Sequence, residues 1–133
     1  MRNSNISQGS QFEREFCETL GKYGWWVHRM TQSAAGQPAD VIAVKDGKAS
    51  LIDCKLCTGK YFDTARIEDN QRSSMKLWGQ CGNGSGWFAV KINGNVYMAS
   101  LRTLDGATKR MLNEKWFVSY AYPFEWWVMT GCM

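Results

Sequence analysis

The sequence predicts an α/β fold built around one mixed β-sheet, and three features support this prediction. Two pairs of apolar, strand-like segments are each joined by a dipeptide that suits a tight turn, Asp46-Gly47 in the first pair and Asn93-Gly94 in the second. A segment with apolar residues at helical spacing stands ahead of each pair. This order of helix, strands, helix and strands is typical of α/β proteins.

The first predicted helix covers about residues 9–22, "GSQFEREFCETLGK", and we expect residues 1–8 before it to be flexible. Its apolar positions recur at helical spacing and are Phe12, Phe16, Leu20 and Tyr23. The short segment "WWVHRM" is rich in strand-forming residues, and the polar segment "TQSAAGQP" after it is predicted to be a loop. The strands "ADVIAVK" and "ASLIDCK" should then pair antiparallel.

The second half of the chain continues the pattern. The segment "ARIEDNQRSSMKLWGQCG" predicts a helix that has Ile67, Met75 and Trp78 on one face and ends at the glycines from Gly82. The segments "GWFAVKI" and "VYMASL" form the second hairpin, and "RTLDGATKRMLN" predicts a short helix. The aromatic tail from Trp116 permits two explanations, which are a subunit interface and the core packing of a last strand.

The composition limits the class of protein. The chain has 133 residues, about the size of one domain, and its net charge of +4 permits a polyanionic partner without requiring one. Five cysteines and a polar N-terminus, "MRNSNISQGSQ", favour a reduced, cytoplasmic location with free thiols. Membrane spans need about 18 or more consecutive apolar residues, and we expect no membrane association because the sequence has no such run.

Charged residues stand at the ends of two strands that otherwise look buried. Leu51, Asp53 and Lys55 share one face of "LIDCK" because side chains alternate along a strand. Asp40 opens the neighbouring strand, and the predicted hairpin brings it back beside Asp53. Burying charges is costly unless they are paired or bind a metal, and Mg²⁺ prefers carboxylate oxygens. We therefore predict a Mg²⁺ site at which Lys55 orients the attacking water or stabilises developing charge.

Glu13 is the acid on the first helix that borders the apolar stripe, so it is the one that can face this site. Taken singly, an acid in a first helical turn is most often a favourable partner of the helix dipole, and an aspartate at a strand end is most often a turn or edge residue. The joint spacing of the four residues favours the catalytic interpretation.

These residues resemble the motif of the PD-(D/E)xK nuclease superfamily, with "PAD" at 38–40 and "DCK" at 53–55. The ordered set "GSQFERE", "GWWVHRMTQS", "PADVIAV", "LIDCK" and "EDNQ" is most similar to Holliday junction resolvases of the archaeal Hjc and bacterial RecU type. The resemblance implies a restriction-endonuclease-like mixed central sheet flanked by helices and a homodimer. It also implies hydrolysis of DNA at four-way junctions with Mg²⁺, or alternatively Mn²⁺, and no small-molecule cofactor.

The resemblance also assigns roles to individual residues. Glu13, Asp40 and Asp53 would be the acidic metal ligands, Lys55 the catalytic lysine, and Gln71 the counterpart of a glutamine in the bacterial enzymes. Phosphate contacts or catalysis would involve Arg14, Arg29 and Ser33. Two departures from the family pattern are the alanine between Pro38 and Asp40, and aspartate rather than the commoner glutamate at position 53. Basic residues near the site add Lys60, Arg66 and Arg72 as expected DNA contacts.

Three other functions remain open at this point. One is a restriction or repair endonuclease of the same fold, because a fold and its active site do not name the substrate. Another is a catalytically silent DNA-binding module of that fold, and a third is a structural partner that docks through the aromatic tail. Cys54 and Cys57 have CxxC spacing, but without a second pair we interpret them as simple thiols, and the single His28 as structural.

Overall fold

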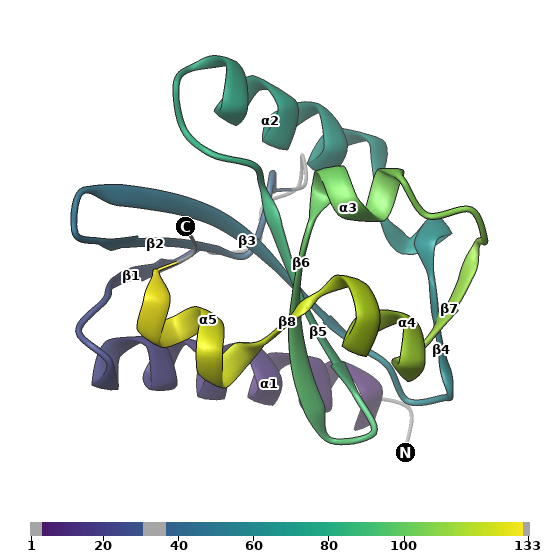
Figure 1. The fold of residues 1–133 in the computed structure, drawn as a ribbon. Helices are drawn as coiled ribbons and strands as arrows, with labels where there is room; N and C mark the ends of the chain where they lie inside the picture. The colour runs from purple at the N-terminus through teal and green to yellow at the C-terminus, as the bar shows by residue number, and fades with distance from the viewer. Residues whose placement is uncertain (1–3, 31–36, 132–133) are drawn as a thin grey trace.

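The structure is a computed structural model that describes residues 4–30 and 37–131 (Figure 1). Its helices are α1 (Ser4–Lys22), α2 (Asp69–Gln80), α3 (Leu101–Asp105), α4 (Glu114–Tyr120) and α5 (Phe124–Thr130), with a 3-10 helix η1 (Thr64–Arg66). Its strands are β1 (Trp26–Arg29), β2 (Val41–Lys45), β3 (Lys48–Leu56), β4 (Tyr61–Asp63), β5 (Trp87–Ile92), β6 (Asn95–Ser100), β7 (Met111–Asn113) and β8 (Tyr122–Pro123).

A six-stranded sheet with the order β1-β2-β3-β5-β6-β8 forms the centre of the fold. The β3–β5 pair is parallel and the other pairs in this sheet are antiparallel, which confirms the predicted mixed sheet. The connection between the two parallel strands contains η1 and α2, as a parallel pair requires a long crossover. Strands β4 and β7 pair separately as a small antiparallel ribbon.

Both predicted hairpins are present, and their turns explain why the dipeptides were informative. Asp46 and Gly47 have φ angles of 52° and 75°, and Asn93 and Gly94 have φ angles of 51° and 78°. Both positions of each turn therefore lie in the left-handed region, which aspartate, asparagine and glycine tolerate best. The turns fix the register of the strands on either side of them.

Hydrophobic clusters lie on both faces of the sheet. On one face, Phe12, Phe16 and Leu20 of α1 pack with Trp127 and Val128 of α5, and all five side chains are buried. The ring of Phe16 also stacks on Phe124 at 4.8 Å between centroids. The prediction that Tyr23 continues the apolar stripe is wrong, because α1 ends at Lys22 and Tyr23 is exposed.

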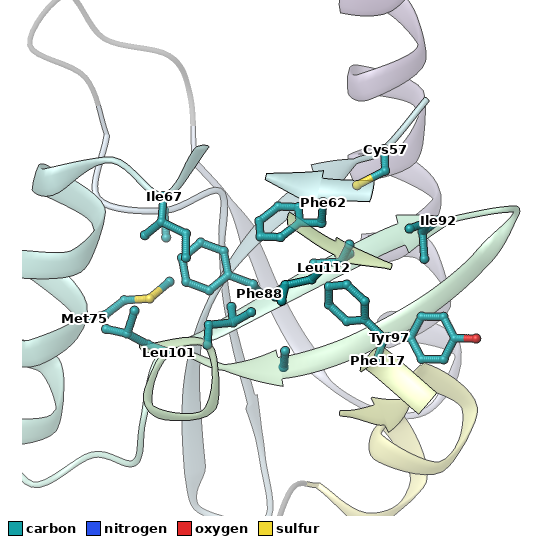
Figure 2. Packing of buried hydrophobic residues seen from close by; sticks show 14 of the residues in the cluster. Cys57, Phe62, Ile67, Met75, Phe88, Ile92, Tyr97, Leu101, Leu112 and Phe117 are labelled. Carbon is teal, nitrogen blue, oxygen red and sulfur yellow. The ribbon is translucent and has the colours of Figure 1, made fainter. Parts of the chain in front are cut away.

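The other face carries the cluster shown in Figure 2, which α2, α3, α4 and the β4–β7 ribbon cover. Met75 of α2 is buried here and Trp78 packs against the cluster, as predicted. Ile67 is also buried but precedes the helix, since α2 begins at Asp69 behind a capping box formed by Glu68 and Gln71. Figure 1 shows α2 and α3 on the opposite side of the sheet from α1 and α5.

Both ends of the chain differ from the expectation. Helix α1 begins at Ser4 rather than at about residue 9. In the tail, core packing is confirmed for Trp127 and Val128, but they lie in the helix α5. Of the tail up to residue 131, Tyr122–Pro123 is the part that pairs with β6. None of the described helices is long and apolar enough to cross a membrane.

Candidate active site

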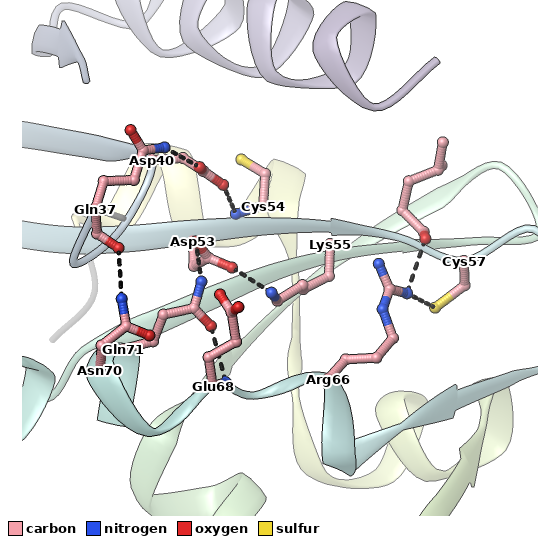
Figure 3. Close-up of polar contacts among 11 residues, drawn as sticks. Gln37, Asp40, Asp53, Cys54, Lys55, Cys57, Arg66, Glu68, Asn70 and Gln71 are labelled. Atoms are coloured by element: carbon pink, nitrogen blue, oxygen red, sulfur yellow. Dashed lines mark hydrogen bonds and ion pairs between the residues drawn. The ribbon is translucent and has the colours of Figure 1, made fainter. Parts of the chain in front are cut away.

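The register of β2 and β3 brings Asp40 and Asp53 together. Val41 pairs with Ile52, and the N–H of Asp40 donates to the carbonyl oxygen of Ile52 at 3.0 Å. Asp40 therefore precedes β2 at the level where Asp53 lies in β3. The ammonium nitrogen of Lys55, on the same face of β3 as Asp53, lies 3.0 Å from Asp53 Oδ2 (Figure 3). The convergence expected of these three residues is present.

Asp53 is almost completely buried, with 2% of its surface exposed. Its Oδ1 accepts a hydrogen bond from Gln71 Nε2 at 3.0 Å, and its Oδ2 accepts none of normal geometry, so the contact with Lys55 is an ion pair. Gln71 is held in turn because its Oε1 accepts from the N–H of Glu68 at 3.2 Å. The capping box that starts α2 thus orients a side chain that supports Asp53.

The carboxylate of Asp40 is held by two donors. Its Oδ1 accepts from Gln37 Nε2 at 2.9 Å, and its Oδ2 accepts from the backbone N–H of Cys54 at 2.8 Å. Asn70 Nδ2 donates to the carbonyl oxygen of Gln37 at 3.3 Å and so ties this segment to α2. Sequence reasoning missed Gln37, and its position three residues before Asp40 was the only available signal.

Burial and a neighbouring charge strongly raise the pKa of Asp53. Desolvation and the neighbouring charge of Asp40 raise the pKa of Asp53 to about 7, and these influences exceed the opposing influence of Lys55. Two carboxylates at one buried strand end therefore disfavour simultaneous ionisation without a further cation. A perturbed acid of this kind, paired with a lysine, is typical of functional sites.

Glu13 lies on α1, on the other side of β3 from Asp53. Its Oε1 accepts from Arg29 Nε at 3.0 Å, and burial and the charge of Asp40 raise its pKa although Arg29 lowers it. A cavity of about 360 Å³ is lined by Glu13 of α1, by Cys54 and Leu56 of β3, and by residues from the segment that follows β3. Within residues 4–30 and 37–131, no group of three or more acidic, cysteine or histidine side chains is arranged to hold a metal.

The predicted DNA-binding residues on the α1 side have different environments. Arg14 is exposed on α1, whereas Arg29 of β1 pairs with Glu13 and donates to the carbonyl oxygen and Oγ of Ser10 at 3.3 and 3.1 Å. Ser33 lies outside the described residues. Arg29 is thus positioned beside the acidic residues through contacts within the protein.

The predicted DNA-binding residues after β3 are also partly used by the fold. Lys60 is exposed between β3 and β4. Arg66 donates to the carbonyl oxygen of Leu56 at 2.9 Å and lies over the ring of Phe62. Arg72 on α2 pairs with Asp105, the last residue of α3. Both arginines therefore have a structural role in this protein.

Comparisons with known proteins identify the family and support the fold of the chain. The family model described as archaeal Holliday junction resolvase (Hjc) matches residues 4–115. A comparison with curated proteins finds no significant match. Among solved structures, Hjc of Archaeoglobus fulgidus, a Holliday junction resolvase from an archaeal hyperthermophile, is similar over 90% of this chain and 99% of that one, with 14% identity and a TM-score of 0.71. Because the family model covers most of the sequence, the chain belongs to the archaeal Holliday junction resolvase family, whose members are endonucleases.

Proposed function

We propose that residues 1–133 form one nuclease domain that uses Mg²⁺ to hydrolyse phosphodiester bonds at four-way DNA junctions. The observation that supports this most strongly is the pair of buried carboxylates, Asp40 and Asp53, with Lys55 at 3.0 Å from Asp53. Family membership supports the junction as the substrate. Because that substrate is DNA, we propose that the enzyme acts in the cytoplasm.

The donor set fits a hard divalent cation. Asp53 Oδ2 is buried beside the ammonium group of Lys55, and burial together with the neighbouring carboxylate of Asp40 raises the pKa of Asp53. A cation held between these carboxylates would relieve their repulsion. Mg²⁺ commonly takes one or two protein carboxylates and completes its shell with water and phosphate oxygens, so Asp40 and Asp53 suffice as ligands. Glu13, which pairs with Arg29 on the other side of β3 from Asp53, would act on the site through its charge beside Asp40.

When bound, the metal supplies Lewis acidity and a water of lowered pKa. Lys55 places an ammonium group next to Asp53, where it stabilises the charge that develops on the attacked phosphate. Gln71 holds Asp53 Oδ1, and Gln37 with the N–H of Cys54 holds the carboxylate of Asp40. These hydrogen bonds keep both carboxylates oriented without removing their remaining lone pairs.

A junction is cut symmetrically when two active sites are related by a two-fold axis, so we propose that the enzyme acts as a homodimer. Exposed Arg14 and Lys60 would contact phosphates directly. The other predicted DNA contacts, Arg29, Arg66 and Arg72, would add positive charge while keeping their contacts within the protein. Mn²⁺ would substitute for Mg²⁺ because both accept oxygen ligands.

The proposal is tested by cleavage of a labelled four-way junction beside linear duplex and single strand of the same sequence. Wild type and Asp53→Asn are compared in Mg²⁺ and in EDTA. The control is Asp46→Asn, which makes the same change at an exposed turn outside the site. We expect paired incisions in the junction, lost in EDTA and in Asp53→Asn and retained in Asp46→Asn.

Other outcomes would separate the alternatives. Equal cutting of linear duplex would keep the nuclease and remove the junction assignment. Tight junction binding without any cleavage in Mg²⁺ or Mn²⁺ would favour a silent binding module, for which the engagement of Glu13 by Arg29 is the structural argument.

A further inference from the structure

A second site lies away from the acidic residues, in a cavity of about 620 Å³ between α3, β7 and α4. We call it the α3–α4 cavity; the residues that matter for its chemistry are Arg102, Lys109, Lys115, Tyr61, Trp116 and Tyr120. Its volume falls within the range of about 300–1,000 Å³ that small-molecule sites occupy. None of the proposed catalytic residues lines it.

The charge of the cavity is entirely positive. Arg102 of α3, Lys109 of the following loop and Lys115 of α4 line it, and no acidic residue does. None of these three cations forms an ion pair within the described part of the chain. The acids nearest to them in sequence have other partners: Asp105 pairs with Arg72, and Glu114 accepts hydrogen bonds from Tyr97 and two asparagines. The cavity is therefore suited to an anion.

Aromatic side chains line the same cavity. Tyr61 and Tyr120 are exposed large hydrophobic residues, with 53% and 63% of their surface accessible. Trp116 of α4 is partly buried against the core, with its ring 5.3 Å from that of Tyr120. Exposed aromatic rings next to unpaired cations are the combination that binds unstacked bases together with their phosphates.

We propose that the α3–α4 cavity binds a nucleotide unit of single-stranded DNA, with the base on Tyr120 and Tyr61 and the phosphate near Lys109 and Lys115. A second copy of the chain is a poorer occupant, because a two-fold axis through the cavity would bring its cations face to face. The family match ends at residue 115, so Trp116 and Tyr120 are features of this chain beyond the matched segment.

The test measures the binding of a fluorescein-labelled 12-nucleotide oligothymidine by anisotropy, in EDTA so that no strand is cut. The variants are K109E/K115E, Y120A and Y120F, and the control K22E/K48E makes the same charge change at exposed lysines outside the cavity. Circular dichroism checks that each variant is folded. Competition with dTMP separates a strand from a free nucleotide as the source of the ligand.

We expect K109E/K115E to weaken oligothymidine binding about tenfold or more and Y120A about fivefold or more, in line with one lost base stack. Y120F, which keeps the ring, and K22E/K48E should bind as wild type does. Displacement of the oligothymidine by dTMP at matched nucleotide concentration would support binding in the cavity and would assign the free nucleotide as its ligand.

Several results would overturn the proposal: no binding by wild type, unchanged binding in both K109E/K115E and Y120A, or equal weakening by K22E/K48E. An equal loss of duplex binding in K109E/K115E would also overturn it, because the proposal requires selectivity for the single strand. Asp53→Asn should leave oligothymidine binding unchanged while it abolishes cleavage. Failure of this proposal is therefore distinguishable from failure of the proposed nuclease activity.

Discussion

Replacement of Asp53 by asparagine should make the metal-free protein more stable at pH 8, although it breaks a buried ion pair with Lys55. The reason is that desolvation and the charge of Asp40 outweigh the attraction to Lys55 and raise the pKa of Asp53 from an ordinary 3.8 to about 7. Between about pH 3.8 and pH 7 the folded protein therefore holds a proton on Asp53 that the unfolded chain releases, and at pH 8 Asp53 is ionised in a buried site that disfavours the charge. Asparagine resembles the protonated acid and cannot ionise, so the variant lacks the free-energy cost of a buried charge at position 53.

The sign and size follow from proton linkage. Because the pKa of Asp53 is raised on folding, the stability it confers is full below about pH 3.8 and is lost as pH rises through about 7. Each pH unit in this window is worth about 1.4 kcal/mol. The stability advantage of Asp53→Asn should therefore grow from near zero below pH 3.8 to about 2 kcal/mol at pH 5 and about 4 kcal/mol above pH 7.

Urea unfolding in EDTA at pH 5, 6, 7 and 8 measures this difference by linear extrapolation. Asp46→Asn is the matched control and should show a difference from wild type that does not change with pH. Addition of Mg²⁺ at pH 8 should stabilise wild type and not Asp53→Asn, because a cation bound to the folded state shifts the equilibrium. A variant that is less stable than wild type at pH 8 would refute the reasoning, since the ion pair with Lys55 would then outweigh burial.

Three further predictions follow from the packing and charges. Gly86→Ala should destabilise the protein by about 1–3 kcal/mol in urea unfolding, because a Cβ there would overlap the buried side chain of Met75. An unchanged midpoint of the urea transition would contradict this. Arg29→Ala should move the acidic limb of the cleavage pH profile to higher pH, because Arg29 lowers the pKa of Glu13. An unmoved limb would contradict the expectation that Glu13 helps to set it. Trp127→Ala should destabilise the protein by about 3–5 kcal/mol, because this fully buried ring stacks on Trp25. A loss below about 1 kcal/mol would contradict that packing.

The pairing of Asp40 with Asp53 was predictable because it depends on local chemistry. The Asp46-Gly47 turn fixes the register of β2 and β3, and the alternation of side chains then fixes the face on which Asp53 and Lys55 lie. The same reasoning predicted the second hairpin. Each of these features is determined by residues that are close in sequence.

Features that depend on packing between distant segments were not predictable. The contact of Gln37 with Asp40 and the pairing of Glu13 with Arg29 depend on how the segment before β2 and the helix α1 pack against the sheet. Glu13 was expected at the metal with Asp40 and Asp53, and the alternation along β3 instead separates it from Asp53. This follows from the packing of α1 on the Cys54 face, which the helical periodicity alone does not specify.

The secondary structure of the aromatic tail was not predictable for a different reason. Phe124, Trp127 and Val128 have the i, i+3, i+4 spacing of a helix, and all are buried in α5. The many aromatic residues around them are also common in strands, so the sequence of the tail was compatible with either a helix or a strand. Tertiary packing against α1 decided between the two structures.

The central claim is that Asp40 and Asp53 together form the metal site from which junctions are cut. The most direct test follows Mn²⁺ binding by electron paramagnetic resonance and junction cleavage in the same Mn²⁺ titration, for wild type, Asp40→Asn, Asp53→Asn and the control Asp46→Asn. We predict that binding and cleavage saturate together in wild type and the control, and that both are lost in the two site variants. Full Mn²⁺ binding or undiminished cleavage in Asp40→Asn and Asp53→Asn would contradict the claim.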